Sequence, residues 1–259
     1  MSILIAPQER RTSEIPHHSD LAPGKRFVFV GRQVYPQSRL YIVGRRVEHV
    51  PKDQPEWLED HRHNCNTFYV YTGDGGDLSG LRAVVTLEGR TFEVAAPAVV
   101  LIPKYALHHY RLIAGSGWSF HVNVRGDYEE SIAAPGEVDP ASVSAPVEKA
   151  VHKVAQRADE GGRWSFIDGR FDRPGIRMAV HQLTGGSTEG SGTPRRAEAD
   201  GASLIIAAPG ETLTAEVRSD EGVVQGASLA TIYHPRGTLW AHGRMEGVGF
   251  VMDAELERA

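Results

Sequence analysis

HRHNCNTFYVYTG, residues 61–73, begins with an H-x-H pair and continues as a strand-like run that ends in glycine. On a β-strand alternate side chains share a face, so His61 and His63 can present two imidazoles to one ion. A third histidine, His108, follows in IPKYALHHY, after further strand-like runs and a proline turn. Neutral imidazole binds iron, nickel, copper and zinc, and three ligands on one face leave coordination positions open for catalysis. The pattern therefore predicts a catalytic metal site on a β-scaffold.

The two segments resemble the two sequence motifs of the cupin superfamily. HRHNCNTFYVYTG is similar to the first motif, an H-x-H pair followed by a carboxylate, an apolar strand and glycine. IPKYALHHY is similar to the second, P-x-G-x-x-H, although Tyr105 replaces its glycine. Asn66 stands near the place where the family usually has a glutamate ligand. The resemblance implies a metal held by His61, His63 and His108, with Asn66 as a weak fourth ligand or as a hydrogen-bond donor beside the metal.

Length, charge and cysteine usage limit the classes of protein. The chain has 259 residues, a formal net charge of −5 and a pI near 6.2, which give no basic footprint for nucleic acid or for an anionic membrane. No run approaches the length of a membrane span, and the short apolar start is not a signal peptide, so we expect a cytoplasmic protein. Cys65 is the only cysteine, which excludes an internal disulfide; we expect a buried thiol rather than a metal ligand.

Short strand-like runs separated by Gly, Pro, Asp and Ser dominate the chain, which favours an all-β barrel or sandwich. RFVFV in the first half matches RWSFI in the second, and later glycine and proline matches follow in the same order. We therefore predict an all-β chain of two tandem cupin barrels, of the double-stranded β-helix or jelly-roll type. The expected division is an N-terminal arm (1–24), a metal-binding barrel (25–130), a linker (131–155) and a degenerate barrel without metal ligands (156–259).

The repeat also provides an internal comparison of the site. Sequence spacing aligns His61 with Glu198, His63 with Asp200, Asn66 with Ser203 and His108 with Trp240. All the imidazoles are absent together in the second half, as expected if they serve one metal in the first. The second barrel is thus predicted to be metal-free; the alternative is that Glu198 and Asp200, with His234 or His242, bind a different ion.

Further candidates lie on the strands that follow. Tyr110 shares the face of His108 by alternation, and His109 points to the opposite face unless the register slips. In WSFHVN (118–123) either the apolar or the polar face lines the barrel, and the polar choice makes His121 a candidate acid, base or substrate contact. His17 and His18 lie in a Pro/Ser-rich arm that we expect to be disordered.

Three histidines without a carboxylate suit an anionic or enediol-like substrate beside dioxygen, and related three-histidine cupins with Fe(II) are often dioxygenases. The resemblance therefore implies a non-heme Fe(II) dioxygenase acting on a small molecule. Two alternatives remain: a redox-neutral isomerase, epimerase or dehydratase that uses Zn, Ni or Mn with His121 as the base, and a non-catalytic binding barrel. We expect no nucleic acid or membrane partner, whereas an unpaired sheet edge makes a homodimer plausible.

Overall fold

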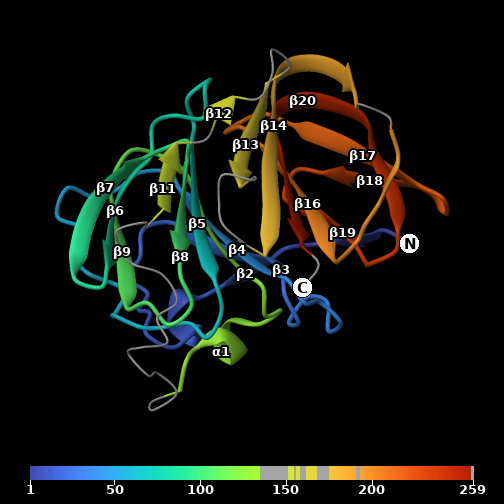
Figure 1. The fold of residues 1–259 in the computed structure, drawn as a ribbon. Helices are drawn as coiled ribbons and strands as arrows, with labels where there is room; N and C mark the ends of the chain where they lie inside the picture. Colours follow the sequence, from blue (N-terminus) through green and yellow to red (C-terminus); the bar gives the residue numbers. More distant parts are fainter. Residues whose placement is uncertain (135–150, 155, 158–161, 168–174, 191–192, 258–259) are drawn as a thin grey trace.

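The computed structural model describes residues 1–134, 151–154, 156–157, 162–167, 175–190 and 193–257, which form two β-barrels side by side (Figure 1). Before the barrels come β1 (Ile3–Ile5), β2 (Gln8–Arg10) and the short 3₁₀ turn η1 (Thr12–Glu14). The first half comprises β3 (Lys25–Val30), β4 (Tyr41–Val47), β5 (Thr67–Gly73), β6 (Arg82–Leu87), β7 (Arg90–Ala95), β8 (Ala98–Ile102), β9 (His108–Ala114), β10 (Gly117–Asn123) and the short helix α1 (Tyr128–Ser131). The second half comprises β11 (Val151–Val154), β12 (Gln156–Arg157), β13 (Arg163–Ile167), β14 (Ile176–Glu189), β15 (Arg195–Arg196), β16 (Gly201–Ala207), β17 (Leu213–Ser219), β18 (Gly222–Ala227), β19 (Ala230–His234) and β20 (Leu239–Leu256).

The two halves have the same strand order. The large sheet of the first half runs β11-β8-β5-β10-β4-β3-β2, and that of the second runs β1-β19-β16-β20-β14-β13-β12. A smaller sheet, β7-β6-β9, faces the first, and β18, β17 and the beginning of β20 take the same places in the second. The prediction of an all-β fold of two tandem barrels is therefore confirmed.

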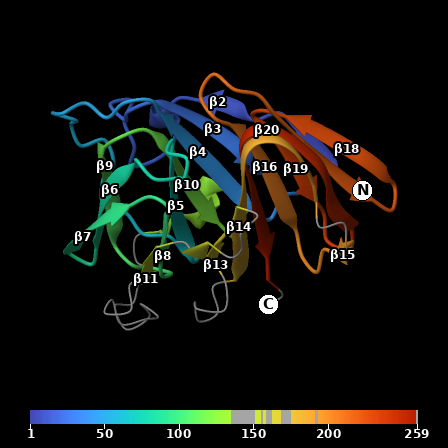
Figure 2. The same cartoon turned by 90° about the horizontal axis from the view of Figure 1, so that it is seen from above.

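The two barrels exchange their first strands. β1, at the start of the chain, pairs with β19 of the second barrel, and β11, which follows the first barrel in sequence, pairs with β8 of the first. Figure 2 accordingly shows the N terminus beside β18. Each barrel is thus completed by a segment that precedes the other barrel in the sequence.

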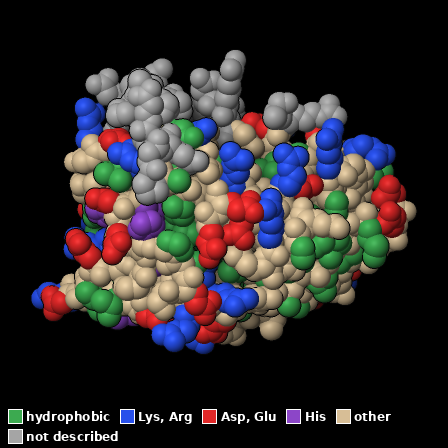
Figure 3. All heavy atoms as spheres, turned by 90° about the horizontal axis from the view of Figure 1, so that it is seen from below, with side chains coloured by type: hydrophobic (Ala, Val, Ile, Leu, Met, Phe, Trp, Pro, Cys, Tyr) green, Lys and Arg blue, Asp and Glu red, His purple; other side chains and the backbone are tan. Residues whose placement is uncertain are grey.

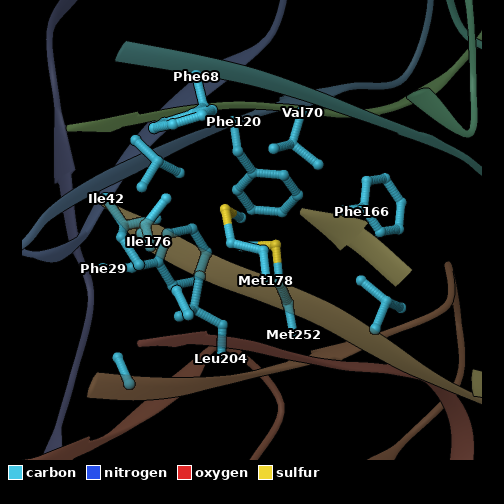
Figure 4. Packing of buried hydrophobic residues seen from close by; sticks show 14 of the residues in the cluster. Phe29, Ile42, Phe68, Val70, Phe120, Phe166, Ile176, Met178, Leu204 and Met252 are labelled. Carbon is cyan, nitrogen blue, oxygen red and sulfur yellow. The ribbon is translucent and has the colours of Figure 1, made fainter. Parts of the chain in front are cut away.

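The core between the barrels is built from the outer faces of the two large sheets. Phe120 of β10 meets Phe250 of β20 with ring centroids 6.3 Å apart. Met178 and Met252 belong to the same core and lie beside Phe120 (Figure 4). Alternation along β10 places Phe120 and its apolar neighbours in this shared core and turns Ser119 and His121 into the first barrel. Burying one such aromatic side chain contributes roughly 1.5–3 kcal/mol. The polar face of β10 therefore lines the barrel.

The hydrogen-bond register corrects the repeat alignment expected from sequence spacing. His61 forms a bridge with His108, whereas Arg195 pairs with Trp240 in the second half. The Tyr105 amide donates to the His63 carbonyl at 2.7 Å, and the Gly237 amide donates to the Ala197 carbonyl at 2.8 Å. The second half of the chain is shorter than the first, and part of the missing length lies in the loop before the segment that begins at His61. The alignment by sequence spacing had placed this loss after that segment. The correspondences in the structure are His61 with Arg195, His63 with Ala197, Asn66 with Asp200 and His108 with Trp240.

Figure 3 shows the face of the molecule seen from below, on which basic and acidic side chains are interspersed. Within the described part of the chain, no helix is both long and apolar enough to span a membrane.

Candidate metal centre

His61, His63 and His108 meet inside the first barrel. His61 and His63 lie in the segment before β5. Isolated β-bridges hold this segment: His61 pairs with His108, the first residue of β9, and His63 pairs with Ile132. The three side chains each offer one nitrogen, and these ligand atoms all lie within 4.8 Å of one another. His61 is 4% exposed, and His63 and His108 are fully buried. The structure thus brings together the three histidines that the sequence singled out.

Hydrogen bonds on Nδ1 fix the orientation of all three rings. Nδ1 of His61 lies 2.9 Å from the Glu59 carbonyl, and Nδ1 of His108 lies 2.9 Å from the Ala106 carbonyl. Because a carbonyl oxygen only accepts, both Nδ1 atoms carry the proton. Nε2 of each ring is therefore left with its lone pair.

His63 reaches the same tautomer through a serine. Its Nδ1 lies 2.9 Å from Ser131 Oγ, while this hydroxyl donates its own proton to the Tyr128 carbonyl at 2.6 Å and accepts from Asn123 Nδ2 at 3.1 Å. The hydroxyl has no second proton to give, so His63 Nδ1 must be the donor.

The free nitrogens fit a metal. Nε2 of His63 and Nε2 of His108 are buried and have no hydrogen-bond partner among the described groups. A buried nitrogen without a partner is costly, whereas a divalent ion bound to the lone pairs of several such atoms would satisfy them together. The donor set of three imidazoles suits iron, nickel, copper or zinc.

Burial keeps the three imidazoles in the form that binds metal. It lowers the pKa of His61 to about 4, against the opposing effect of the bond to the Glu59 carbonyl. The pKa values of His63 and His108 also lie well below their usual range, because of burial and then the neighbouring imidazoles. All three rings are neutral near pH 7, and no proton has to leave before a metal binds.

Of three other candidates near the motif, Cys65 and His109 do not join the cluster, and Asn66 has another partner. The side-chain oxygen of Asn66 accepts from the Lys104 amide at 3.0 Å, as the equivalent Asp200 accepts from Arg236, so this oxygen secures a loop. Asn66 as a ligand stays a prediction. Cys65 is buried, with the pKa of its thiol raised by burial, and it lies outside the cluster. His109 points away from the barrel and bonds Asp60 at 2.6 Å.

His121 and Tyr110 lie beside the three histidines. The His121 ring is 5.1 Å from that of His63, and its buried Nε2 has no partner within the described structure. Burial, followed by the charge effect of His61, holds the pKa of His121 well below its ordinary value. Tyr110 packs between Trp57 and Tyr69, with ring centroids 5.1 and 4.6 Å away. Both residues therefore line the interior, an orientation that the sequence left open for His121, and their catalytic roles stay predictions.

Sequence reasoning missed the residues that cover the cluster. The Tyr128 hydroxyl of α1 lies 3.2 Å from His61 Nε2, and His18 packs edge-on against Tyr128 with centroids 5.4 Å apart. His17 stacks on His61 at 5.5 Å. The expectation that His17 and His18 lie in a disordered arm is wrong, because both rings pack against this aromatic cover. One available signal was Asp127, whose carboxylate caps α1 by accepting from the Glu129 amide, a pattern typical of a helix start.

Two buried arginines beside the cluster were also missed. Arg26 and Arg45 are 4% and 5% exposed. Arg26 donates to the Tyr41 hydroxyl at 2.8 Å, and Arg45 donates to Thr12 Oγ1 at 2.8 Å and lies 4.7 Å above the Trp57 ring. Neither guanidinium pairs with a carboxylate among the described residues. Burying a cation without an anion is costly, so this pair is suited to a bound anion.

The cavity between these groups is small. Its volume is about 20 Å³, which is about the room that one water needs. Its walls are Ile15, His18, Arg26, Val43, Gly44, Arg45, Trp57, Tyr110, Ser119, His121 and Tyr128. A substrate larger than water therefore requires side chains that line the cavity to move.

Comparison with known proteins defines the fold. No family model matches the sequence, and no curated protein matches it. Among solved structures, a mutant of oxalate decarboxylase OxdC from Bacillus subtilis is 14% identical with a TM-score of 0.59, covering 98% of this chain and 78% of that one. Ylba from E. coli is 14% identical with a TM-score of 0.60, covering 100% and 92%. AerE from Microcystis aeruginosa is 12% identical with a TM-score of 0.57, covering 98% and 99%. These likenesses show that the chain has the cupin fold.

Proposed function

We propose that the first barrel is a metal-dependent enzyme acting on a small organic acid, and that it is a non-heme Fe(II) dioxygenase. The observation that carries the proposal is the convergence of three neutral histidines whose Nδ1 protons are held, so that all three Nε2 lone pairs face one place; those of His63 and His108 are free, and that of His61 meets only the Tyr128 hydroxyl. In this proposal His61, His63 and His108 are the metal ligands.

The charge around the cavity indicates the substrate class. Arg26 and Arg45 place two buried cations against the cavity, and three neutral ligands leave the full charge of a divalent ion uncompensated. A carboxylate can pair with a guanidinium and ligate a divalent ion at the same time. Oxalate, the substrate named for one structurally similar protein, is a small diacid of this chemical class. We therefore infer a small mono- or dicarboxylate as substrate.

The chain's own side chains supply the remaining functions. A bound Fe(II) would provide redox and Lewis-acid chemistry at the three nitrogens. Arg26 and Arg45 would orient the carboxylate, and Tyr128 and His18 would exclude water once the substrate is in place. In this proposal His121, neutral near pH 7 and with no hydrogen-bond partner on Nε2 among the described groups, would accept a proton from the substrate.

The free Nε2 of His121 also favours a second candidate function. A base beside a Lewis-acidic metal is what a redox-neutral isomerase, epimerase or dehydratase uses to move a proton. Oxygen would then play no part, and Zn, Ni or Mn would support activity as well as iron.

The test combines metal content with oxygen uptake. Protein purified without chelator is compared with His61→Ala and His108→Ala, and with His109→Ala as a matched control one residue away from the cluster. We expect one equivalent of iron to be lost in the first two variants and kept in the third, and oxygen uptake with a member of a small-carboxylate panel. Turnover of an acid under anaerobic conditions would establish the second function instead. Full metal content and activity in both ligand variants would contradict the site.

A further inference from the structure

A second cluster of metal-binding side chains lies inside the second barrel. It consists of His181 on β14 and of His242 and Asp253 on β20, whose ligand atoms all lie within 4.8 Å of one another. Asp253 Oδ2 is 2.8 Å from His242 Nε2 and 3.3 Å from His181 Nε2. His242 and Asp253 are each 8% exposed, and His181 is half-buried.

The cluster does not occupy the positions of the first metal centre. Those positions carry Arg195, Ala197, Asp200 and Trp240 in the second barrel. Trp240 fills the place of His108 and stacks between His234, at a centroid distance of 4.1 Å, and the Arg195 guanidinium at 4.4 Å. A metal in the second barrel therefore needs other ligands.

The cluster lies in the barrel interior at positions next to those of the first metal centre, and this set of neighbouring inward positions is called a layer here. Asp253 pairs with Ser203 and Ala179 on its two sides, in the way that His121 pairs with Tyr69 and Val43 in the first barrel. By the same comparison of registers, His181 corresponds to Arg45 and His242 to Tyr110. The layer that carries cavity-lining side chains in the first barrel thus carries two imidazoles and a carboxylate in the second.

The surroundings support a built site. Ser203 Oγ donates to Asp253 Oδ1 at 2.6 Å and is itself 3.0 Å from His234 Nε2, so one carboxylate oxygen is oriented and Oδ2 is directed at the two imidazoles. On the other side His181, His242 and Asp253 line a cavity of about 530 Å³. An ion at this place would have an oriented carboxylate behind it and open positions in front.

We propose that His181, His242 and Asp253 bind a divalent transition metal in the second barrel. Adjacent ligands on a metal with bonds of about 2.1 Å lie about 3.0–3.4 Å apart, close to the observed separations. Two imidazoles and one carboxylate with open positions form the facial triad used for iron, and the set also suits zinc, cobalt and nickel. The expectation of a metal-free second barrel, and the alternative set built on Glu198 and Asp200, would both be replaced by this site.

The experiment removes the metal ligands of the first barrel, so that metal binding by the second barrel is measured separately from the proposed function of the first. The full-length His61→Ala/His108→Ala variant is stripped of metal, titrated with Co²⁺ alone, and examined by metal analysis after dialysis and by visible absorption. We expect one equivalent of Co²⁺ to remain. Adding His181→Gln should weaken that binding at least tenfold, because one of the three ligands is removed, whereas the matched Asp200→Asn variant should keep it.

Two results would overturn the proposal. One is a folded His61→Ala/His108→Ala protein, with a cooperative thermal transition, that retains no Co²⁺. The other is retention that His181→Gln leaves unchanged, which would place the ion elsewhere. If the double variant does not fold, His181→Gln in the otherwise native chain must lower the stoichiometry from two equivalents to one, and an unchanged stoichiometry would again overturn it.

Discussion

Ser131→Ala should weaken metal binding by the first barrel without touching a metal ligand. The Ser131 hydroxyl donates to the Tyr128 carbonyl, so it can only accept from His63 Nδ1, and it thereby holds the tautomer in which His63 Nε2 is free. Alanine removes that acceptor. The His63 ring can then rotate or place its proton on Nε2, and either change removes a lone pair from the metal.

The magnitude follows from the role of the Ser131 hydroxyl. Groups that orient a metal-binding histidine typically account for about 10- to 100-fold in metal affinity. This corresponds to about 1.4–2.7 kcal/mol of binding free energy. Asn123 Nδ2 loses its acceptor as well, so we also expect the free energy of unfolding to fall by about 1–3 kcal/mol.

The assay is competition for the metal with a coloured chelator at pH 7, on the full chain. Ser119→Ala is the matched control: Ser119, on β10, is buried like Ser131, but its hydroxyl has no hydrogen-bond partner within the described structure. Thermal unfolding checks that both variants are folded. A Ser131→Ala affinity within twofold of the native value would refute the idea that the Nδ1 bond of His63 controls the site.

Three further results are expected. Metal-stripped protein should lose stability as the pH falls from 7 to 5, because His61 takes up a proton in the unfolded chain but, with a pKa of about 4, not in the folded one. His61 alone should lower the free energy of unfolding by about 2 kcal/mol, measured by urea titration at both pH values. Equal stability at the two pH values would contradict this. Phe120→Ala should lower the free energy of unfolding by about 3–5 kcal/mol in urea titration, whereas Leu229→Ala, 39% exposed, should change it by less than about 0.5 kcal/mol; equal losses would contradict the shared core. Arg45→Met should weaken calorimetric binding of small carboxylates about tenfold with metal content unchanged, and unaltered binding would remove the support for a carboxylate substrate.

The three histidines could be predicted because local rules govern them. Period-two alternation places His61 and His63 on one face, and the proline turn before His108 brings a third imidazole after a short strand excursion. The same alternation offered two orientations for β10 and could not choose, because both of its faces are buried: one in the shared core and one in the barrel. Only the presence of the second large sheet decides which face carries His121.

The cover of the site follows no local rule. Tyr128 and Ser131 lie on a four-residue helix after β10, and His18 comes from the segment before β3, so each reaches the histidines only through the closed tertiary structure. Arg26 and Arg45 look like solubilising residues in the sequence. They are buried because they occupy inward positions of β3 and β4, beneath the arm that the sequence suggested was disordered.

The error in the repeat alignment has a physical cause that bears on the second barrel. Glycines and prolines can be matched at turns whose lengths differ, whereas the barrel fixes inward positions by hydrogen-bond register. When the two barrels are aligned by hydrogen-bond register instead of by sequence spacing, Arg195 is equivalent to His61 and Asp253 is equivalent to His121. The fold thus determines where inward side chains converge but leaves their chemistry free in each layer. Absence of the motif from the second barrel therefore says nothing about the adjacent layer, where two imidazoles and a carboxylate converge.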